Sequence, residues 1–409
     1  MLTNSQRLAL EILKSKENCF VSGAAGTGKS YLIDYYRRYF APNVPIVAST
    51  GMAALLVSGR TFHSFFGIGL MNQDLKTTLE NVKKNFPLIR RIKNTNQIVI
   101  DEVSMLPGLA LEYASEICKQ IKQNEQPFGG IRVIITGDFF QLPPVTMVKP
   151  IDWAFKSPVW KELNLKPVLL NEFMRTTELD FLKNLNEIRF GNISTEVREF
   201  LNKKISNIDL NQFEGTRIFS RKNEVDEYNK KRLAMIPSPV ITLKTIYSGK
   251  PEHIERLKKN LVFSDKIELK KDALVMIRIN DPKGQFVNGS LGTVESILID
   301  KVIIELLSGE IVSIPTHKFE LKDGDNRTLA VAENFPITLA YAITIHKSQG
   351  STIDRAVMDL KKLWEPGQAY TALSRLKSSE GLFLVDWDSK SIFAAKEVID
   401  FYKNAAIIK

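Results

Sequence analysis

Short apolar runs alternate with longer amphipathic segments along the first 170 residues. The runs typical of buried strands are Cys19-Phe20-Val21, Ile46-Val47-Ala48, Ile98-Val99-Ile100 and Val133-Ile134-Ile135. Apolar residues recur at helical spacing between these runs, for example over 31–40 and 109–122. Strands that alternate with helices predict parallel βαβ units and a doubly wound α/β sheet. Ligands of such sheets bind at the carboxyl ends of the strands.

The same alternation returns in the second half of the chain. Apolar runs over 217–219, 356–358 and 382–385 are each followed by a helical pattern, over 223–233, 366–375 and 391–402. Between residues 241 and 334 the pattern changes to short strands separated by glycine turns. This predicts a second α/β domain into which a small β-rich, SH3-like module is inserted. We expect the first domain at 1–175, the second at 176–240 and 335–409, and the module at 241–334.

The chain carries an excess of positive charge, which indicates what kind of partner it binds. The 409 residues include 56 Lys and Arg against 46 Asp and Glu, which gives a formal net charge of +10. Such an excess favours a polyanionic partner, most often nucleic acid. A basic surface with no particular partner is the alternative at this point.

Several classes of protein are excluded by what the sequence lacks. It has two cysteines, no CxxC pair and four widely spaced histidines, which excludes a disulfide framework and a cysteine or HExxH metal site. No apolar run reaches the ~18 residues of a membrane-spanning helix, and the charged N-terminus is unlike a signal peptide. We therefore expect a cytoplasmic protein in a reducing compartment, with no membrane partner.

A phosphate-binding loop follows the first predicted strand. The segment Gly23-Ala24-Ala25-Gly26-Thr27-Gly28-Lys29-Ser30 fits GxxxxGK[ST], and a helical pattern follows it. Backbone N–H groups of such a loop bind phosphates at a helix N-terminus, and glycines leave room for the turn and for the phosphate. Lys29 is expected to reach the β- and γ-phosphates of ATP, and the Ser30 hydroxyl to bind Mg²⁺. The alternative is a glycine turn that binds no nucleotide.

Two adjacent carboxylates end the strand at Ile98-Val99-Ile100-Asp101-Glu102. Beside a phosphate-binding loop, such a strand end delivers one acid to Mg²⁺ and a second to the attacking water. Asp101 is predicted to hold the metal through water, and Glu102 to be the general base. An acidic strand end alone is often only a solvated turn. Glu102 favours an ATPase that turns over, because a nucleotide switch does not need this base.

A third strand end leads into Gly137-Asp138-Phe139-Phe140-Gln141-Leu142-Pro143-Pro144. Gln141 can orient water or sense a γ-phosphate, and the two prolines stiffen the segment that leads away from it. A simple turn is the alternative.

Arg175 and Arg375 are candidate arginine fingers if the two α/β halves face each other across ATP. A surface or ion-paired arginine is the alternative for each of them.

An aromatic cluster follows residue 61. Phe62, Phe65 and Phe66 lie beside His63, and such rings can stack on the bases of a single strand. Burial in the core is the alternative, which we favour for Phe62, and a structural role is the alternative for His63.

Taken together, these motifs resemble superfamily 1 helicases, specifically the PIF family of 5′-to-3′ DNA helicases, which is related to RecD-like enzymes. The similarity extends over nearly the whole chain. Further segments that carry it are Leu2-Thr3-Asn4-Ser5-Gln6, Ser49-Thr50-Gly51-Met52-Ala53-Ala54, Thr61-Phe62-His63-Ser64-Phe65, Pro127-Phe128-Gly129-Gly130-Ile131, Val287-Asn288-Gly289-Ser290-Leu291-Gly292, Thr344-Ile345-His346-Lys347-Ser348-Gln349-Gly350 and Tyr370-Thr371-Ala372-Leu373-Ser374-Arg375. One departure is Thr176, where many members have Gln, so no role is assigned to position 176.

The resemblance implies roles for residues that spacing alone does not assign. Gln6 would read adenine, and Gly350 would lie beside the nucleotide. The residues expected to contact DNA are Thr50, Gly51, His63, Phe65, Pro143, Thr344, His346, Lys347 and Ser348. A small insert over 66–92 is the candidate wedge for strand separation. The resemblance also carries the 5′-to-3′ direction, which no spacing in the chain encodes.

The resulting expectation is two RecA-like motor domains that use ATP and Mg²⁺ to move on single-stranded DNA and unwind duplexes or forks. A monomeric motor is expected. Because the phosphate-binding loop begins after 22 residues, a compact bacterial, archaeal or viral enzyme is expected. An ATPase subunit active only in a larger recombination complex and a non-motor ATP-gated clamp are the two rivals.

Overall fold

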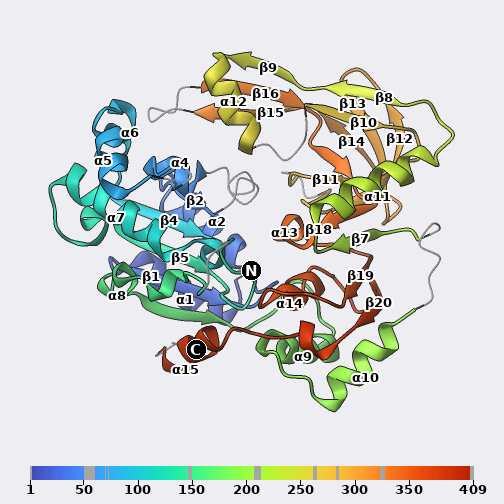
Figure 1. Ribbon diagram of the computed structural model, residues 1–409, viewed down its shortest axis with the longest axis horizontal. Helices are drawn as coiled ribbons and strands as arrows, with labels where there is room; N and C mark the ends of the chain where they lie inside the picture. The colour runs from blue at the N-terminus through green and yellow to red at the C-terminus, as the bar shows by residue number, and fades with distance from the viewer. Residues whose placement is uncertain are drawn as a thin grey trace.

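The protein has two α/β parts side by side, with a β-rich module beyond the second (Figure 1). The computed structural model describes residues 2–49, 60–69, 71, 73–145, 150–206, 213–260, 265–281, 285–322 and 328–405. No helix in these ranges is long and apolar enough to cross a membrane.

The first part contains a six-stranded sheet in the order β3-β2-β4-β5-β1-β6. Its strands, all paired in parallel, are β1 (Cys19–Gly23), β2 (Ile46–Ala48), β3 (Arg60–Thr61), β4 (Gln97–Asp101), β5 (Arg132–Gly137) and β6 (Lys166–Leu170). The doubly wound parallel sheet predicted from the apolar runs is thus confirmed. Buried residues alternate between its two faces, so that Ile98 and Ile100 join one core and Val99 joins another.

Helices cover both faces of this sheet, which explains why its strands are apolar at nearly every position. The helices are α1 (Asn4–Lys14), α2 (Lys29–Phe40), α4 (Phe62–Phe66), α5 (Leu75–Lys83), α6 (Phe86–Lys93), α7 (Gly108–Lys122) and α8 (Pro158–Glu162), with short 3₁₀ helices η1 (Val103–Met105), η2 (Pro127–Gly130) and η3 (Ala154–Lys156). Helices α5 and α6 occupy most of the candidate wedge segment 66–92 and lie at the outer edge of this part (Figure 1).

The second part has a four-stranded parallel sheet in the order β18-β7-β19-β20. Its strands are β7 (Thr216–Phe219), β18 (Ala342–Thr344), β19 (Ala356–Leu360) and β20 (Leu382–Trp387). Its helices are α9 (Leu179–Phe190), α10 (Thr195–Lys204), α11 (Lys222–Ala234), α13 (Ile345–Ser348) and α14 (Gln368–Leu373), with η4 (Ser389–Ser391). One apolar core is continuous from the first sheet into the second, because Ile100 and Met358 belong to the same cluster.

The β-rich module lies in sequence between β7 and β18 and has its own apolar core around Val275, Val294 and Ile304. Its strands, paired antiparallel, are β8 (Ile241–Lys244), β9 (Ile246–Gly249), β10 (Lys266–Leu269), β11 (Leu274–Ile277), β12 (Leu291–Ile297), β13 (Lys301–Leu306), β14 (Ile311–Pro315), β15 (His317–Lys322), β16 (Thr328–Asn334) and β17 (Ile337–Leu339), with helix α12 (Pro251–Asn260). The expected β-rich insert is therefore present.

We propose the domain division 1–175, 176–240 with 335–409, and 241–334. Two features of the packing cross these domain boundaries. Strand β17 pairs with β11 inside the module's sheet. The C-terminal helix α15 (Lys396–Asn404) packs on the first sheet, where the ring of Phe401 lies 6.1 Å from that of Phe20 and 4.5 Å from that of Phe155.

Candidate active site

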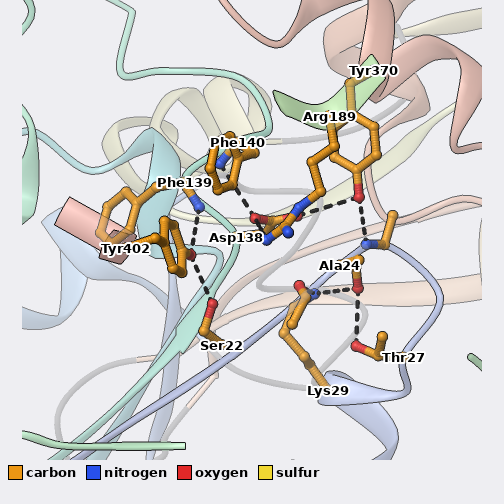
Figure 2. Close-up of polar contacts among 12 residues, drawn as sticks. Ser22, Ala24, Thr27, Lys29, Asp138, Phe139, Phe140, Arg189, Tyr370 and Tyr402 are labelled. Carbon is orange, nitrogen blue, oxygen red and sulfur yellow. Dashed lines mark hydrogen bonds and ion pairs between the residues drawn. The ribbon is translucent and has the colours of Figure 1, made fainter. Parts of the chain in front are cut away.

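The phosphate-binding loop connects β1 to α2, as its sequence predicts. Gly26 and Gly28 adopt φ values of +83° and +79°, which side chains rarely tolerate. A Cβ at Gly28 would also lie 2.5 Å from Nε2 of Gln6. The Lys29 ammonium donates to the carbonyls of Gly23 at 2.8 Å and Ala24 at 3.1 Å, at the base of the loop (Figure 2).

Lys29 is a buried cation with carboxylates around it. Burial lowers its pKa, whereas the nearby charges of Asp138, Glu102 and Asp101 act to raise it. The positive charge at the base of the loop is therefore supported by acids from two neighbouring strand ends. This is the arrangement that a polyphosphate with a bound cation would enter.

Asp101 and Glu102 end β4 beside this loop. Burial and the neighbouring Glu102 charge raise the pKa of Asp101 to about 7, although the Ser30 hydroxyl and the Glu102 N–H hydrogen bond to its carboxylate. A hydroxyl and a carboxylate in contact are oxygen ligands of the kind Mg²⁺ prefers, so Ser30 and Asp101 fit the expected metal. Glu102 itself lies in the left-handed region, at φ 53° and ψ 47°.

A buried acid beyond β5 links the loop to the second domain (Figure 2). Asp138 is paired with Arg189 of α9 through contacts of 2.7 Å and 3.1 Å. The Tyr370 hydroxyl of α14 donates to Asp138 at 3.3 Å and accepts from the Ala25 N–H at 2.9 Å. Both charges of the pair are buried, so loss of one partner would cost about 3–5 kcal/mol. The network therefore fixes α9 and α14 against the phosphate-binding loop.

The C-terminal helix reaches the same region. The Tyr402 hydroxyl hydrogen bonds to the Ser22 hydroxyl at 2.7 Å and accepts from the Phe139 N–H at 3.3 Å (Figure 2). Burial, followed by the nearby charge of Asp138, raises the pKa of this hydroxyl, so it stays neutral at physiological pH. Helix α15 thus supports the strand that enters the phosphate-binding loop.

Both candidate finger arginines lie at the junction of the two domains. Arg175 donates to the Ser374 carbonyl, and a Cβ at Gly26 would lie 2.9 Å from the Cβ of Arg175. Burial and the charge of Arg375 lower the pKa of Arg175 to about 9. Arg375 is buried and donates to Thr371 O and to the Ser374 hydroxyl, both at 2.9 Å. The structure therefore brings the two arginines together beside the loop.

Gln141 also lies at this junction. Its side chain is buried, and its Oε1 has no hydrogen-bond partner among the residues described. A Cβ at Gly367 would lie 2.6 Å from the Gln141 carbonyl oxygen, so the start of α14 packs directly on this turn. An unpartnered polar oxygen at this position is free to accept from water.

Gln6, which was expected to read adenine, is hydrogen-bonded within the protein. Its Nε2 donates to Thr27 O at 3.1 Å, its Oε1 accepts from the Thr3 N–H at 3.1 Å, and its side chain has no exposed surface. A contact with adenine would need one of these hydrogen bonds to open, and the role of Gln6 as adenine reader stays a prediction. The geometry makes Gln6 a support that holds α1 against the phosphate-binding loop.

Glu172 anchors the start of α1 and carries a pH-dependent prediction. It accepts from the Ser5 N–H and hydroxyl, both at 2.7 Å, and hydrogen bonds from the Thr3 and Ser5 hydroxyls lower its pKa to about 2. Because this pKa lies below the ordinary value of 4.5, the stabilisation is complete above about pH 4.5 and is lost as pH falls towards 2. We expect Glu172→Gln to lower the free energy of unfolding at pH 7, by an amount that shrinks on acidification.

Denaturant unfolding of both proteins at pH 7, 4.5 and 2.5 measures this difference. Glu162→Gln, at an exposed position of α8, is the control and should lower stability at none of these pH values. A Glu172→Gln deficit that stayed constant or grew as the pH fell would contradict the argument.

The expected DNA contacts of the first domain are corrected in part. Thr50 and Gly51 lie outside the described residues. His63 is half-buried on α4, and burial lowers its pKa. Phe65 is only 3% exposed and packs between Phe66 and the Arg91 guanidinium, so it cannot stack on a base from this position. Pro143 is also buried, which removes its expected contact.

The expected DNA contacts of the second domain gather on one turn, α13. Thr344 caps it, because its hydroxyl accepts from the Lys347 N–H at 3.1 Å. The Ser348 hydroxyl is fully buried and donates to Ile345 O at 2.7 Å, so the expected direct DNA contact of Ser348 is wrong. Lys347 is exposed, and His346 is half-buried with Glu365 3.7 Å away. These two side chains remain available to phosphates.

Gly350 follows this turn with a φ of +75°, on the same segment as Gln349, whose amide contacts Glu102. The backbone beside Gly350 therefore lies near the candidate base, and its place by the nucleotide stays a prediction. Arg278 donates to the Lys347 carbonyl at 3.4 Å, and the charges of Lys222 and Arg278 add to desolvation in lowering the pKa of Lys347. Several cations thus surround the turn.

Sequence reasoning left five contributing residues without a role: Asp138, Arg189, Gln349, Tyr370 and Tyr402. Two of them carried a usable signal in the sequence. Asp138 stands directly after β5, and Gln349 stands close to His346 and Lys347 in the chain. Arg189 and Tyr402 carry no such signal, since each meets its partner only through packing of distant segments.

Comparison with known proteins identifies the family of this chain. Residues 1–199 match the model of the family described as PIF1-like helicase. The ATP-dependent DNA helicase Pif1 of Bdellovibrio bacteriovorus is 43% identical over 98% of this chain and 92% of its own length. Pif1 of a Bacteroides species in complex with ADP-AlF4 superposes with a TM-score of 0.86 at 27% identity, over 98% of this chain and 96% of that chain. Bacteroides Pif1 in complex with ADP-AlF3 and ssDNA gives a TM-score of 0.68 at 27% identity, over 98% and 97%.

The 43% identity over nearly the full length of both chains decides the family. The chain belongs to the PIF1-like helicases.

Proposed function

We propose that this protein is an ATP-dependent DNA helicase that moves 5′-to-3′ on single-stranded DNA and unwinds duplex DNA. One observation carries the motor mechanism: a loop built by the first domain is held by residues of the second. Tyr370 of α14 accepts from the Ala25 N–H, and Arg175 donates to the Ser374 carbonyl. A nucleotide in this loop therefore lies between two domains whose separation its hydrolysis can change. The direction of movement rests on the family resemblance alone.

Each residue of the site then has a proposed task. Lys29 and the backbone N–H groups of Gly23 to Ser30 hold the phosphates, and Ser30 and Asp101 would hold Mg²⁺, which neutralises developing charge on the phosphates when bound. Glu102 accepts the proton of the attacking water, and Gln141 orients that water. Arg175 and Arg375 stabilise charge in the transition state, a task worth about 10³–10⁵-fold in rate.

The DNA path is proposed to cross both domains. His346 and Lys347 grip phosphates on the second domain, and His63 contributes on the first. Contacts of this type are independent of sequence, which suits a motor that must release and rebind any strand, and they weaken as salt rises. The segment 66–92 is the proposed wedge. We propose that the enzyme works as a monomer in the cytoplasm, where its two buried free cysteines stay reduced.

ATP turnover with and without oligonucleotide tests this function. We call α13, which carries His346 and Lys347, the DNA-gripping turn. We expect single-stranded DNA to raise turnover well above the basal rate, because Gln349 directly follows this turn and its amide donates to the candidate base Glu102. We also expect a duplex with a 5′ tail to be unwound and a duplex with a 3′ tail to be left intact. Blunt duplex is the control substrate.

The outcomes separate the rival functions. Binding of ATP and DNA without turnover would favour a clamp. Turnover that appeared only after other proteins were added would favour a subunit of a larger complex. Stimulated turnover with unwinding from the 3′ tail would overturn the direction and leave the helicase function standing.

A further inference from the structure

Gln349 connects the DNA-gripping turn directly to the candidate base. It follows α13, and its Nε2 donates to Oε2 of Glu102 at 3.1 Å across the domain junction. The side chain is 8% exposed, and its amide oxygen has no hydrogen-bond partner among the residues described. The bond to Glu102 is therefore the main polar anchor of this side chain within the described structure.

This hydrogen bond opposes the work of a general base. A hydrogen bond from an amide to one carboxylate oxygen engages one lone pair and fixes the orientation of the whole group, so the carboxylate is not free to turn its other lone pairs towards water. Glu102 is also held at φ 53°, a backbone region that non-glycine residues rarely occupy and that is found at functional sites with more than one state. Glu102 is thus restrained by the second domain while its own backbone is strained.

The turn that carries Gln349 is tightly connected to the residues that would meet DNA. The Gln349 N–H donates to His346 O at 3.3 Å, and the Ser348 hydroxyl donates to Ile345 O at 2.7 Å. The Thr344 hydroxyl accepts from the Lys347 N–H at 3.1 Å. A shift of His346 or Lys347 towards a phosphate would therefore carry Gln349 with it.

We propose that Gln349 is a positioning residue that withholds Glu102 from the attacking water until DNA engages His346 and Lys347. This inference rests on the proposed function and adds its regulation: DNA stimulates hydrolysis by drawing the Gln349 amide away from the base. Gln349 thereby keeps ATP from being consumed when no strand is bound.

Gln349→Met tests this directly, because methionine has a similar volume and no donor. We expect ATP turnover without DNA to rise about tenfold, the equivalent of removing one hydrogen bond to a charged group. The KM for ATP should stay within about twofold, and the stimulation by single-stranded DNA should fall by the same factor as the basal rate rises. Gln349→Asn, whose shorter amide cannot reach Glu102, should behave alike and serves if the methionine variant does not fold.

Two further variants test whether the added basal turnover depends on position 349 and on the Glu102 carboxylate. Gln120→Met makes the same chemical change on the exposed face of α7 and should leave basal turnover unchanged. Adding Glu102→Gln to Gln349→Met should return turnover to the level of Glu102→Gln alone, because the added rate passes through that carboxylate. A merely structural role for Gln349 would lower basal turnover and would not raise it.

The results divide cleanly. Basal turnover in Gln349→Met at or below that of the unaltered protein, or added turnover that survives Glu102→Gln, would overturn the inference. If the unaltered protein itself fails to respond to single-stranded DNA, the proposed function fails first. If it responds and Gln349→Met leaves basal turnover unchanged, only the role of Gln349 fails.

Discussion

Lys29→Ala abolishes ATP turnover, with an expected loss in kcat/KM of at least about 10³-fold. The Lys29 ammonium is buried at the base of the phosphate-binding loop, 2.8 Å from the Gly23 carbonyl, with three carboxylates near enough to affect its pKa. Its removal takes a positive charge away from Asp101 and Glu102, while Asp138 keeps its ion pair with Arg189, so the site would repel a polyphosphate. Steady-state ATPase assays and binding of a fluorescent ATP analogue measure the two losses.

Lys161→Ala is the matched control, since Lys161 is exposed on α8 in the same domain. It should turn over ATP at the normal rate. Thermal unfolding of both variants separates loss of chemistry from loss of fold. Lys29→Ala that was folded and hydrolysed ATP within about tenfold of the normal rate would show that the loop is not the nucleotide site.

Glu102→Gln has the second large effect: ATP still binds, and hydrolysis falls by about 10²–10⁴-fold. The amide keeps the size of the side chain and loses the capacity to accept a proton from water. Lys29, Ser30 and Asp101 are untouched, so the affinity for ATP should change by no more than a few-fold. Single-turnover hydrolysis and equilibrium ATP binding measure the two quantities separately.

Glu162→Gln, at an exposed position of α8, is the control and should hydrolyse ATP normally. Hydrolysis retained in Glu102→Gln would mean that another group takes the proton. Loss of ATP binding in this variant would instead place Glu102 among the phosphate- or metal-binding groups.

Much of the first sheet could be predicted because four of its strands, β1, β2, β4 and β5, are short and almost wholly buried. Helices cover both faces of the first sheet, so Ile98, Val99 and Ile100 are all apolar and the strand can be recognised without its neighbours. The β-rich insert was recognisable for the opposite reason, since its glycine turns interrupt the helical pattern. The packing of α15 on the first sheet was not predictable, because this segment follows the second domain in sequence and meets Phe20 and Phe155 only through packing of distant elements.

The site residues also fall into those that the sequence can predict and those that it cannot. Lys29, Asp101 and Glu102 could be predicted as site candidates because a loop and a strand end place them through local order along the chain, and the structure brings these candidates close together. DNA contacts were expected from three residues that are buried in the structure, Phe65, Pro143 and Ser348. A residue inside a recognisable motif can support that motif by packing or capping and need not touch the ligand. The role of Gln6 as adenine reader stays a prediction, since its amide is engaged at both ends within the protein.

By itself, the sequence determined the two α/β units, the phosphate-binding loop and the acids that follow β4, because each depends on interactions between near neighbours in the chain. Only the tertiary structure decided which distant groups meet there. Three pairs join the two domains: Arg189 with Asp138, Tyr370 with Ala25, and Gln349 with Glu102. Such pairs leave no periodic trace, since packing of whole elements brings them together.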